Sequence, residues 1–283
     1  MNSEDIDMTD ISLVKRYFGR IKQNYEEKLM FYEKDMDIKS DESITYKYNN
    51  EGFRCDDFTK EKSGLHILFG GCSETEGSSN KLEDVWANVL FNKIKQDNEV
   101  SGYYNVGKAG LTVSGVVMNV FQYAYDYGCP DYIFLQLPDQ TRYITWSESL
   151  GWYPKYQVKD TDVYNDIDNE HFFKNHEAPE VIKVNILFNY LLLRNLMQFC
   201  KINNITLIWS TWHAPTARAI LDSGSNLDGY VNTSNFNKDY WDIKLNDLRA
   251  RDGYHFGRGF HRVWAEKFYE EFLDAKNNQK TNS

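Results

Sequence analysis

The feature that most constrains the fold is an alternation of short apolar segments with longer amphipathic segments, which begins at residue 65. The expected strands cover residues 66–69, 103–106, 132–137 and 205–209. Apolar side chains recur at helical spacing elsewhere, and the expected helices cover residues 82–94, 113–125, 179–192 and 260–272. Strand–helix units repeated in this order predict an α/β fold, with a mostly parallel sheet between two layers of helices. The third strand is expected to be covered on both faces, because its apolar residues form a continuous run.

Two segments fall outside this pattern, and a short tail follows it. Residues 1–64 are expected to form an N-terminal extension, helical over residues 13–31 and irregular beyond, ahead of a main domain at residues 65–275. Residues 139–178 are aromatic, charged and irregular, and we interpret them as a long insertion after the third strand. Its aromatic side chains could form a lid or a stacking platform for a sugar, or they could bury the insertion against the domain. Residues 276–283 are polar and are expected to fray.

Composition and charge limit the classes of partner. The chain has 283 residues with 32 Lys and Arg against 42 Asp and Glu, so its formal net charge is −10. An acidic chain lacks the basic surface that binding to a phosphate backbone requires, so we expect no nucleic-acid partner. The apolar stretches fall short of the roughly 20 residues of a membrane helix, and the acidic first residues do not resemble a secretory signal. We therefore expect a soluble, cytoplasmic protein with no membrane partner.

The cysteines and histidines do not suggest a metal or redox site. Cys55, Cys72, Cys129 and Cys200 are far apart and form no CxxC pair, so we expect reduced thiols. The histidines likewise lack the spacing of metal ligands. We predict neither a metal nor a cofactor.

Candidate functional residues are sought at the carboxyl ends of the strands, where ligands bind in sheets of this kind. The first expected strand runs into Gly70-Gly71-Cys72-Ser73. This loop could project a serine from a tight turn next to a helix N-terminus, or it could be a plain turn. The loop after the second strand contains Gly110, whose N–H could be presented without obstruction, as an oxyanion hole requires. That glycine could equally serve helix entry through a positive φ.

An Asp-x-x-His pattern, formed by Asp252 and His255, stands immediately before the last expected helix. A carboxylate three residues ahead of a histidine can reach the Nδ1 atom of the ring. Such a contact fixes the tautomer and stabilises the imidazolium that forms when Nε2 takes a proton from a hydroxyl. A structural histidine with a capping aspartate is the alternative interpretation.

In their order and setting, the serine loop, the glycine loop and the Asp-x-x-His pattern resemble the SGNH (GDSL-type) hydrolase superfamily over residues 65–275. The resemblance implies a three-layer flavodoxin-like α/β/α sandwich and hydrolysis of esters through a serine acyl-enzyme. It implies Ser73 as the nucleophile, His255 as the general base and then acid, and Asp252 as the residue that orients the histidine. It also implies the backbone N–H groups of Ser73 and Gly110 as oxyanion donors.

The segment after the third strand departs from the family pattern, which places an asparagine side chain there as a further oxyanion donor. This chain has Asp139, Gln140 and Arg142 in that segment and no asparagine. The Gln140 amide or the Arg142 charge could replace the asparagine, whereas a carboxylate at Asp139 would oppose an oxyanion. Losing one such donor costs about 10²–10³ in rate. Cys72, which occupies the family's usual aspartate position beside Ser73, is either an alternative nucleophile or a buried thiol that supports the turn.

The candidate substrate-binding residues are His213, Arg142 and Trp146. His213 follows the fourth strand, so it should lie near the site, although it could serve ordinary packing there. Trp146 belongs to the aromatic insertion.

Two functions from different classes remain open. The first is a serine esterase that removes an O-acyl group, acetyl being the simplest, from a carbohydrate or another small ester. The second is a catalytically degenerate binding or structural protein, for instance in a phage particle, because the segment after the third strand has no asparagine and the N-terminal segment could serve as an attachment element. In that case residues 1–64 could mediate self-association or attach to a virion, which would make the protein virion-associated. The sequence also resembles uncharacterised proteins of bacteriophages and marine bacteria.

Overall fold

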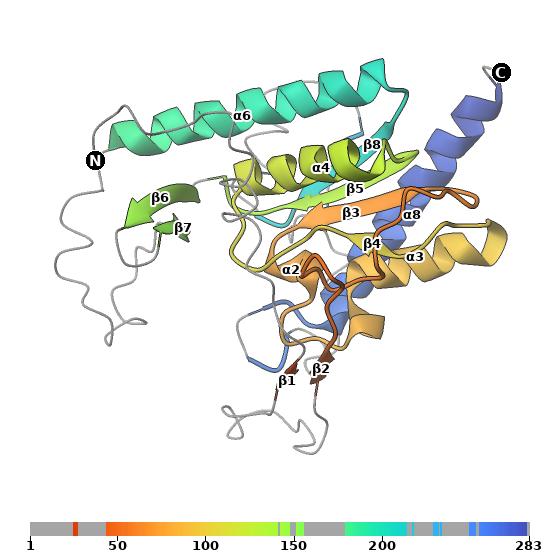
Figure 1. Cartoon of the computed structure of the whole chain (residues 1–283), viewed down its shortest axis with the longest axis horizontal. Helices are drawn as coiled ribbons and strands as arrows, with labels where there is room; N and C mark the ends of the chain where they lie inside the picture. The colour runs from red at the N-terminus through yellow and green to blue at the C-terminus, as the bar shows by residue number, and fades with distance from the viewer. Residues whose placement is uncertain are drawn as a thin grey trace.

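The computed structural model describes residues 25–27, 44–140, 142–147, 151–155, 179–213, 217, 229–231, 233, 249–252 and 255–281. At its centre lies a parallel sheet (Figure 1). In spatial order the sheet consists of β4 (Tyr104–Asn105), β3 (Ile67–Gly71), β5 (Tyr132–Leu137) and β8 (Thr206–Thr211). The chain places β4 on one side of β3 and β5 on the other, so the direction of winding reverses at β3. The predicted strands and their parallel arrangement are confirmed, with small differences at their ends.

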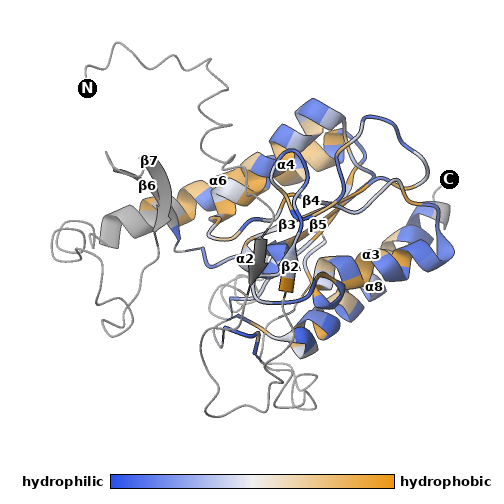
Figure 2. Cartoon of the chain, turned by 60° about the horizontal axis from the view of Figure 1, so that its bottom comes forward, coloured by the Kyte–Doolittle hydropathy of each residue, from blue (hydrophilic) through white to orange (hydrophobic). Residues whose placement is uncertain are grey.

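Helices cover both faces of the sheet in the described part of the chain, and the fold therefore has three layers. α3 (Trp86–Asp97) and α8 (Arg258–Thr281) lie on one face, whereas α4 (Val113–Tyr127) and α6 (Pro179–Ile202) lie on the other (Figure 1). A short helix, α2 (Ser73–Glu76), follows β3 directly. Figure 2 shows α3 and α8 alternating between orange and blue, as expected for helices with one apolar face. The predicted α/β/α architecture is confirmed.

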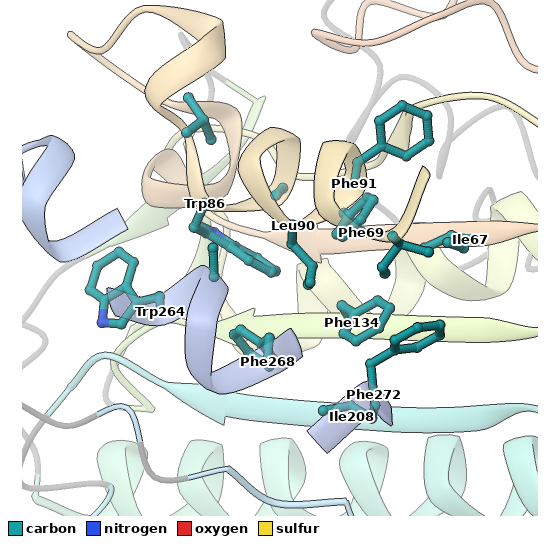
Figure 3. Packing of buried hydrophobic residues seen from close by; sticks show 14 of the residues in the cluster. Ile67, Phe69, Trp86, Leu90, Phe91, Phe134, Ile208, Trp264, Phe268 and Phe272 are labelled. Carbon is teal, nitrogen blue, oxygen red and sulfur yellow. The ribbon is translucent and has the colours of Figure 1, made fainter. Parts of the chain in front are cut away.

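Aromatic side chains fill the layer between the sheet and helices α3 and α8. Phe134 of β5 stacks on Phe69 of β3 with ring centroids 5.5 Å apart. Trp86 of α3 stacks on Phe268 of α8 at 4.8 Å (Figure 3). All of these side chains are fully buried. Burial of each large apolar side chain contributes about 1.5–3 kcal/mol. Aromatic residues make up 16% of the chain, and this layer contains several of them.

The opposite layer is mainly aliphatic. Leu68 and Ile133 of the sheet pack there with Val116 of α4 and Leu196 of α6. Ile133 therefore faces one layer of helices while its neighbour Phe134 faces the other. β5 is buried on both faces, as the continuous apolar run predicted.

The helix predicted over residues 82–94 is interrupted after its first turn. A 3₁₀ turn, η1 (Leu82–Asp84), is followed by Val85 in an extended conformation, and α3 begins at Trp86. The backbone N–H of Trp86 donates to Nδ1 of His261 at 3.2 Å and not to a carbonyl of the preceding turn. The prediction of one continuous helix was wrong here, because a histidine distant in the sequence replaces the helical acceptor.

Residues 44–62 pack closely against the start of the sheet domain. The buried guanidinium of Arg54 donates to the carbonyl oxygens of Glu76, Gly77 and Asn80 at 3.2, 2.7 and 3.1 Å. These carbonyls belong to the end of α2 and the turn that follows it. This part of the expected N-terminal extension therefore supports the loop that contains Ser73.

Most of the helix predicted over residues 13–31 lies outside the described residues. The described part, β1 (Tyr25–Glu27), is a strand that pairs antiparallel with β2 (Ile44–Tyr46), so the helix prediction was wrong there. Strand pairing suits the alternation in β2, where Ile44 and Tyr46 are buried and Thr45 is exposed.

The insertion contains an antiparallel hairpin where the sequence predicted irregular structure. The hairpin consists of β6 (Tyr143–Ser147) and β7 (Gly151–Lys155), whose backbones pair Trp146 opposite Trp152. β6 is rich in aromatic and β-branched residues, and β7 contains two aromatic residues, all of which favour extended structure. No helix in the described ranges is both long enough and apolar enough to span a bilayer.

Candidate active site

Ser73 is the first residue of α2 and follows directly from the carboxyl end of β3 through Cys72. It is 7% exposed, and its hydroxyl donates to Sγ of Cys72 at 3.8 Å. The first N–H groups of a helix have no acceptor within the helix. Within the described part of the chain no acceptor occupies the Ser73 N–H, which leaves that group available to an anionic ligand.

Close packing explains two glycines around α2. A Cβ added at Gly71 would lie 2.0 Å from Oγ1 of Thr75, and one added at Gly107 would lie 2.7 Å from Cγ2 of the same threonine. Thr75 is fully buried between the two loops, and its hydroxyl accepts a hydrogen bond from Nε1 of Trp86. Any side chain at either glycine would displace the helix that starts at Ser73.

The loop after β4 is hydrogen-bonded to α2 at several points. The buried side chain of Asn105 donates through Nδ2 to the Thr75 carbonyl at 2.8 Å, and its Oδ1 accepts from the Gly107 N–H at 2.8 Å. The Ala109 N–H donates to Oε2 of Glu76 at 2.7 Å. These bonds keep the two loops in a fixed relationship.

Gly110, the expected second oxyanion donor, lies in this loop with a φ of +82°. A positive φ of this size favours glycine, as the helix-entry interpretation requires. Its N–H has no hydrogen-bond acceptor among the described residues. Gly110 thus adopts the positive φ that helix entry requires, and its N–H remains available to an oxyanion.

Asp252 and His255 form a hydrogen-bonded pair. Oδ2 of Asp252 lies 2.5 Å from Nδ1 of His255, and Oδ1 accepts from the backbone N–H of the same histidine at 3.0 Å. A carboxylate at Nδ1 makes that nitrogen the protonated one in the neutral ring and leaves the lone pair of Nε2 to accept a proton. Each side chain is about one quarter exposed, so the ring remains accessible.

The charges around His255 favour its protonated form. Burial lowers the pKa of the ring, but the hydrogen bond to Asp252 and the negative charges of Glu74 and Asp252 outweigh burial. Arg142 acts in the opposite direction. The pKa of His255 is consequently raised above its ordinary value of 6.5.

Glu74 joins the serine helix to the histidine segment. Its Oε1 accepts a hydrogen bond from the backbone N–H of Phe256 at 3.4 Å, so the residue after Ser73 contacts the residue after His255. The structure thus connects the segment that carries Ser73 to the segment that carries the Asp252–His255 pair. Among the described residues, no hydrogen bond joins the Ser73 hydroxyl to His255 itself.

The segment after β5 brings a positive charge to the same edge of the sheet. Arg142 donates to the Leu111 carbonyl at 3.4 Å, and its guanidinium lies 5.3 Å from the ring centre of Trp212. Its charge lowers the pKa of both His255 and Glu74, so it lies within electrostatic reach of both groups. The backbone carbonyl of Gln140 accepts from the buried amide of Asn189 in α6 at 3.0 Å, which attaches this segment to a helix.

A second histidine–carboxylate pair lies at the ends of β5 and β8. Nδ1 of His213 is 3.4 Å from Oδ1 of Asp139, and both side chains are partly exposed. Burial lowers the pKa of His213, and Arg142 acts in the same direction, whereas Asp139 raises it. His213 was predicted to lie near the site, but its pairing with Asp139 was not predicted.

Cys72 and Trp146 were also candidate site residues, and two further residues near the site were not predicted. Cys72 is fully buried beside Ser73, which is the setting of a supporting thiol. The side chain of Trp146 lies outside the described part of the structure. Glu74 and Asn189 were not among the predicted site residues, although the carboxylate immediately after Ser73 was a visible signal.

No protein-family model and no curated protein matches this sequence. Solved structures that resemble it include the psychrotrophic esterase EstA from Pseudoalteromonas sp., in a form inhibited by monoethylphosphonate. That match has 13% identity and a TM-score of 0.42, and it covers 75% of this chain and 98% of that chain. A GDSL-like lipase from Bacteroides thetaiotaomicron matches at 13% identity and a TM-score of 0.41, over 74% of this chain and 88% of that chain.

Proposed function

We propose that this protein is a serine hydrolase that cleaves an O-acyl ester through an acyl-enzyme at Ser73. The observation that carries the proposal is the Asp252–His255 pair, which Phe256 attaches to Glu74, the neighbour of Ser73. The group lies beyond the carboxyl end of β3, where ligands bind in sheets with this winding.

The proposed reaction begins when Nε2 of His255 accepts the proton of the Ser73 hydroxyl and Oγ attacks the ester carbonyl carbon. The tetrahedral intermediate collapses as its bond to the alkoxy oxygen breaks, and the alcohol leaves with the proton from His255. Water then attacks the acyl-enzyme with the same histidine as base, which releases the acid and restores Ser73. Asp252 holds the ring and stabilises the imidazolium in both halves.

The developing oxyanion would be bound by the backbone N–H groups of Ser73 and Gly110. Arg142 supplies a positive charge at the same edge of the sheet, and the Gln140 amide is a further candidate donor. Such donors are effective because they are already oriented before charge develops. A site without the usual asparagine donor is expected to be slower by about 10²–10³.

The substrate class that we propose is an acylated carbohydrate or another small ester, with acetyl as the simplest acyl group. Trp212 offers an aromatic side chain at the end of β8, next to the polar pair of His213 and Asp139. A flat apolar surface flanked by hydrogen-bonding groups is the combination that a sugar ring requires.

Fluorophosphonate labelling followed by peptide mass spectrometry tests the nucleophile. We expect an adduct on Ser73 that is lost in Ser73→Ala and strongly reduced in His255→Ala. An adduct on Cys72, or no adduct on a folded protein, would overturn the assignment. Comparing p-nitrophenyl acetate with an O-acetylated sugar then tests the substrate class.

A second candidate function is a binding or structural protein that has kept the fold without catalysis, for instance in a phage particle. It is favoured by the hydrogen bond of the Ser73 hydroxyl to Cys72 and by the absence of an asparagine from the segment after β5. In that case self-association or binding to a particle through residues 1–64 should survive in Ser73→Ala, and wild-type protein should hydrolyse no ester.

A further inference from the structure

Glu74 is a buried carboxyl group that no step of the proposed reaction uses. It is 5% exposed, and its Oε1 accepts the Phe256 N–H at 3.4 Å. Its Oε2 has no hydrogen-bond partner within the described residues and lies 3.6 Å from Nε2 of His261 in α8. A buried carboxyl oxygen without a partner is costly, so its position needs a physical reason.

The tautomer of His261 supplies that reason. Nδ1 of this ring accepts the backbone N–H of Trp86, and burial lowers the pKa of His261 to about 3, so the ring is neutral. Its single ring proton must therefore be on Nε2. The nearby amide of Asn80 donates to the carbonyl of Phe256 at 3.0 Å, so its nitrogen faces His261 and cannot accept that proton. The Nε2–H group then has two acceptors nearby, the backbone carbonyl of Phe256 and Oε2 of Glu74.

Polar groups thus face both oxygens of the Glu74 carboxyl group, although only Oε1 accepts a hydrogen bond from the described residues. Phe256 N–H approaches one oxygen and His261 Nε2–H faces the other. These donors come from the segment and helix that follow His255, whereas Glu74 itself follows Ser73. Glu74 therefore connects the element that carries the serine to the element that carries the histidine.

We propose that Glu74 is a positioning residue that fixes His255 relative to Ser73 and supplies a negative charge to the imidazolium formed during acyl transfer. The inference deepens the proposed function and rests on it. Glu74 acts through His255 and through the backbone of Phe256, and it takes no part in bond making or breaking.

The charges that face this group agree with that role. On His255 the Glu74 and Asp252 charges favour protonation, and Arg142 opposes it. On Glu74 burial raises the pKa to about 7, while the charge of His255, the Phe256 N–H and Arg142 lower it and Asp252 raises it. A proton gained by His255 therefore favours the ionised form of Glu74, and an ionised Glu74 favours the imidazolium.

The Glu74→Gln variant tests the charge while keeping the size and an acceptor oxygen. The His255 ring resonances are followed by NMR from pH 5 to pH 9. We expect the pKa of His255 to fall in this variant, and the acid limb of the pH profile of kcat/KM to move to lower pH with it. Glu76→Gln is the matched control, because it removes a buried carboxylate of the same helix that is not among the charges acting on His255. An unchanged His255 titration in folded Glu74→Gln would overturn the proposal.

A measurement on the wild-type protein tests the proposal even if the Glu74→Gln variant does not fold. The carboxyl carbon of Glu74, labelled with carbon-13, should titrate well above the range of an exposed glutamate and should respond to the ionisation of His255. A Glu74 titration that does not respond to the ionisation of His255 would overturn the proposal. Coupled titration without any serine labelling would support the Glu74–His255 interaction and count against ester hydrolysis, so the two failures are distinguishable.

Discussion

Replacing Glu74 with glutamine should remove a pH-dependent loss of folding stability. Burial raises the pKa of Glu74 from 4.5 to about 7, so between these values the folded chain retains a proton that the unfolded chain has released. Stability must therefore fall as the pH rises through this window. At about 1.4 kcal/mol for each pKa unit, the full difference amounts to about 3 kcal/mol.

Urea unfolding followed by tryptophan fluorescence at pH 5 and pH 8 measures this effect. The difference in free energy of unfolding between variant and wild type is determined at each pH, and the value at pH 5 is subtracted from the value at pH 8. Any effect of the substitution that does not depend on pH cancels in this subtraction. Most of the range between the two pKa values of Glu74 lies between pH 5 and pH 8. From pH 5 to pH 8, the free energy of unfolding of Glu74→Gln should therefore rise by about 2–3 kcal/mol relative to that of wild type. His255 acts in the same direction, because its raised pKa also makes the wild-type protein lose stability as the pH rises through that pKa.

A variant without a titratable change provides the control. Leu196→Ala removes a fully buried side chain of α6, so its difference from wild type should be the same at pH 5 and pH 8. If the difference in free energy of unfolding between Glu74→Gln and wild type is the same at pH 5 and pH 8, the reasoning is refuted. Glu74 would then ionise equally in the folded and unfolded chains.

The remaining predictions concern catalysis and the scaffold. Asp252→Asn should lower kcat with p-nitrophenyl acetate by about 10³–10⁴, because an amide would favour the wrong tautomer of His255. In the wild-type protein kcat/KM should rise with pH through the raised pKa of His255, since only the neutral ring accepts the serine proton. Arg54→Met should lower the free energy of unfolding by about 2–4 kcal/mol in urea, because the buried carbonyls that it serves lose their donor. Leu196→Ala should cost about 2–5 kcal/mol in the same assay, whereas Leu187→Ala, at a position 57% exposed, should change stability by less than about 0.5 kcal/mol.

Local patterns predicted most of the sheet and its helices. The third strand was predicted with the bounds that β5 has, because a continuous apolar run ends in a proline-containing turn. α4 was predicted with similar success because apolar side chains recur every three or four residues, while Thr112 caps its first turn and Gly128 follows its last. The spacing of Asp252 and His255 likewise put a carboxylate within reach of Nδ1, and the two atoms lie 2.5 Å apart.

Contacts between distant residues account for what the sequence did not predict. Arg54 lies in the part of the N-terminal extension that was expected to be irregular, yet its carbonyl partners lie 22 to 26 residues further along the chain and bury it. Glu74 accepts from a residue 182 positions away. A charged residue is normally exposed, and only the fold shows which charges have partners that make burial tolerable. The same reason explains the break before α3, where His261 takes the place of a helical carbonyl.

The hydrogen bonds around the site indicate what must change for Ser73 to become a nucleophile. Asn105 and Glu76 bind the loop after β4 to the serine helix, and Asp252 binds His255. The part of the site that carries the serine and the part that carries the histidine are therefore each fixed by their own hydrogen bonds. The bond that competes with catalysis is the one from the Ser73 hydroxyl to Cys72, at 3.8 Å. A thiol sulfur is a weak acceptor, so exchanging it for the lone pair of a histidine nitrogen is favourable in itself. Under the proposed function, the step from resting site to active site therefore includes a change of hydrogen-bond partner by the Ser73 hydroxyl.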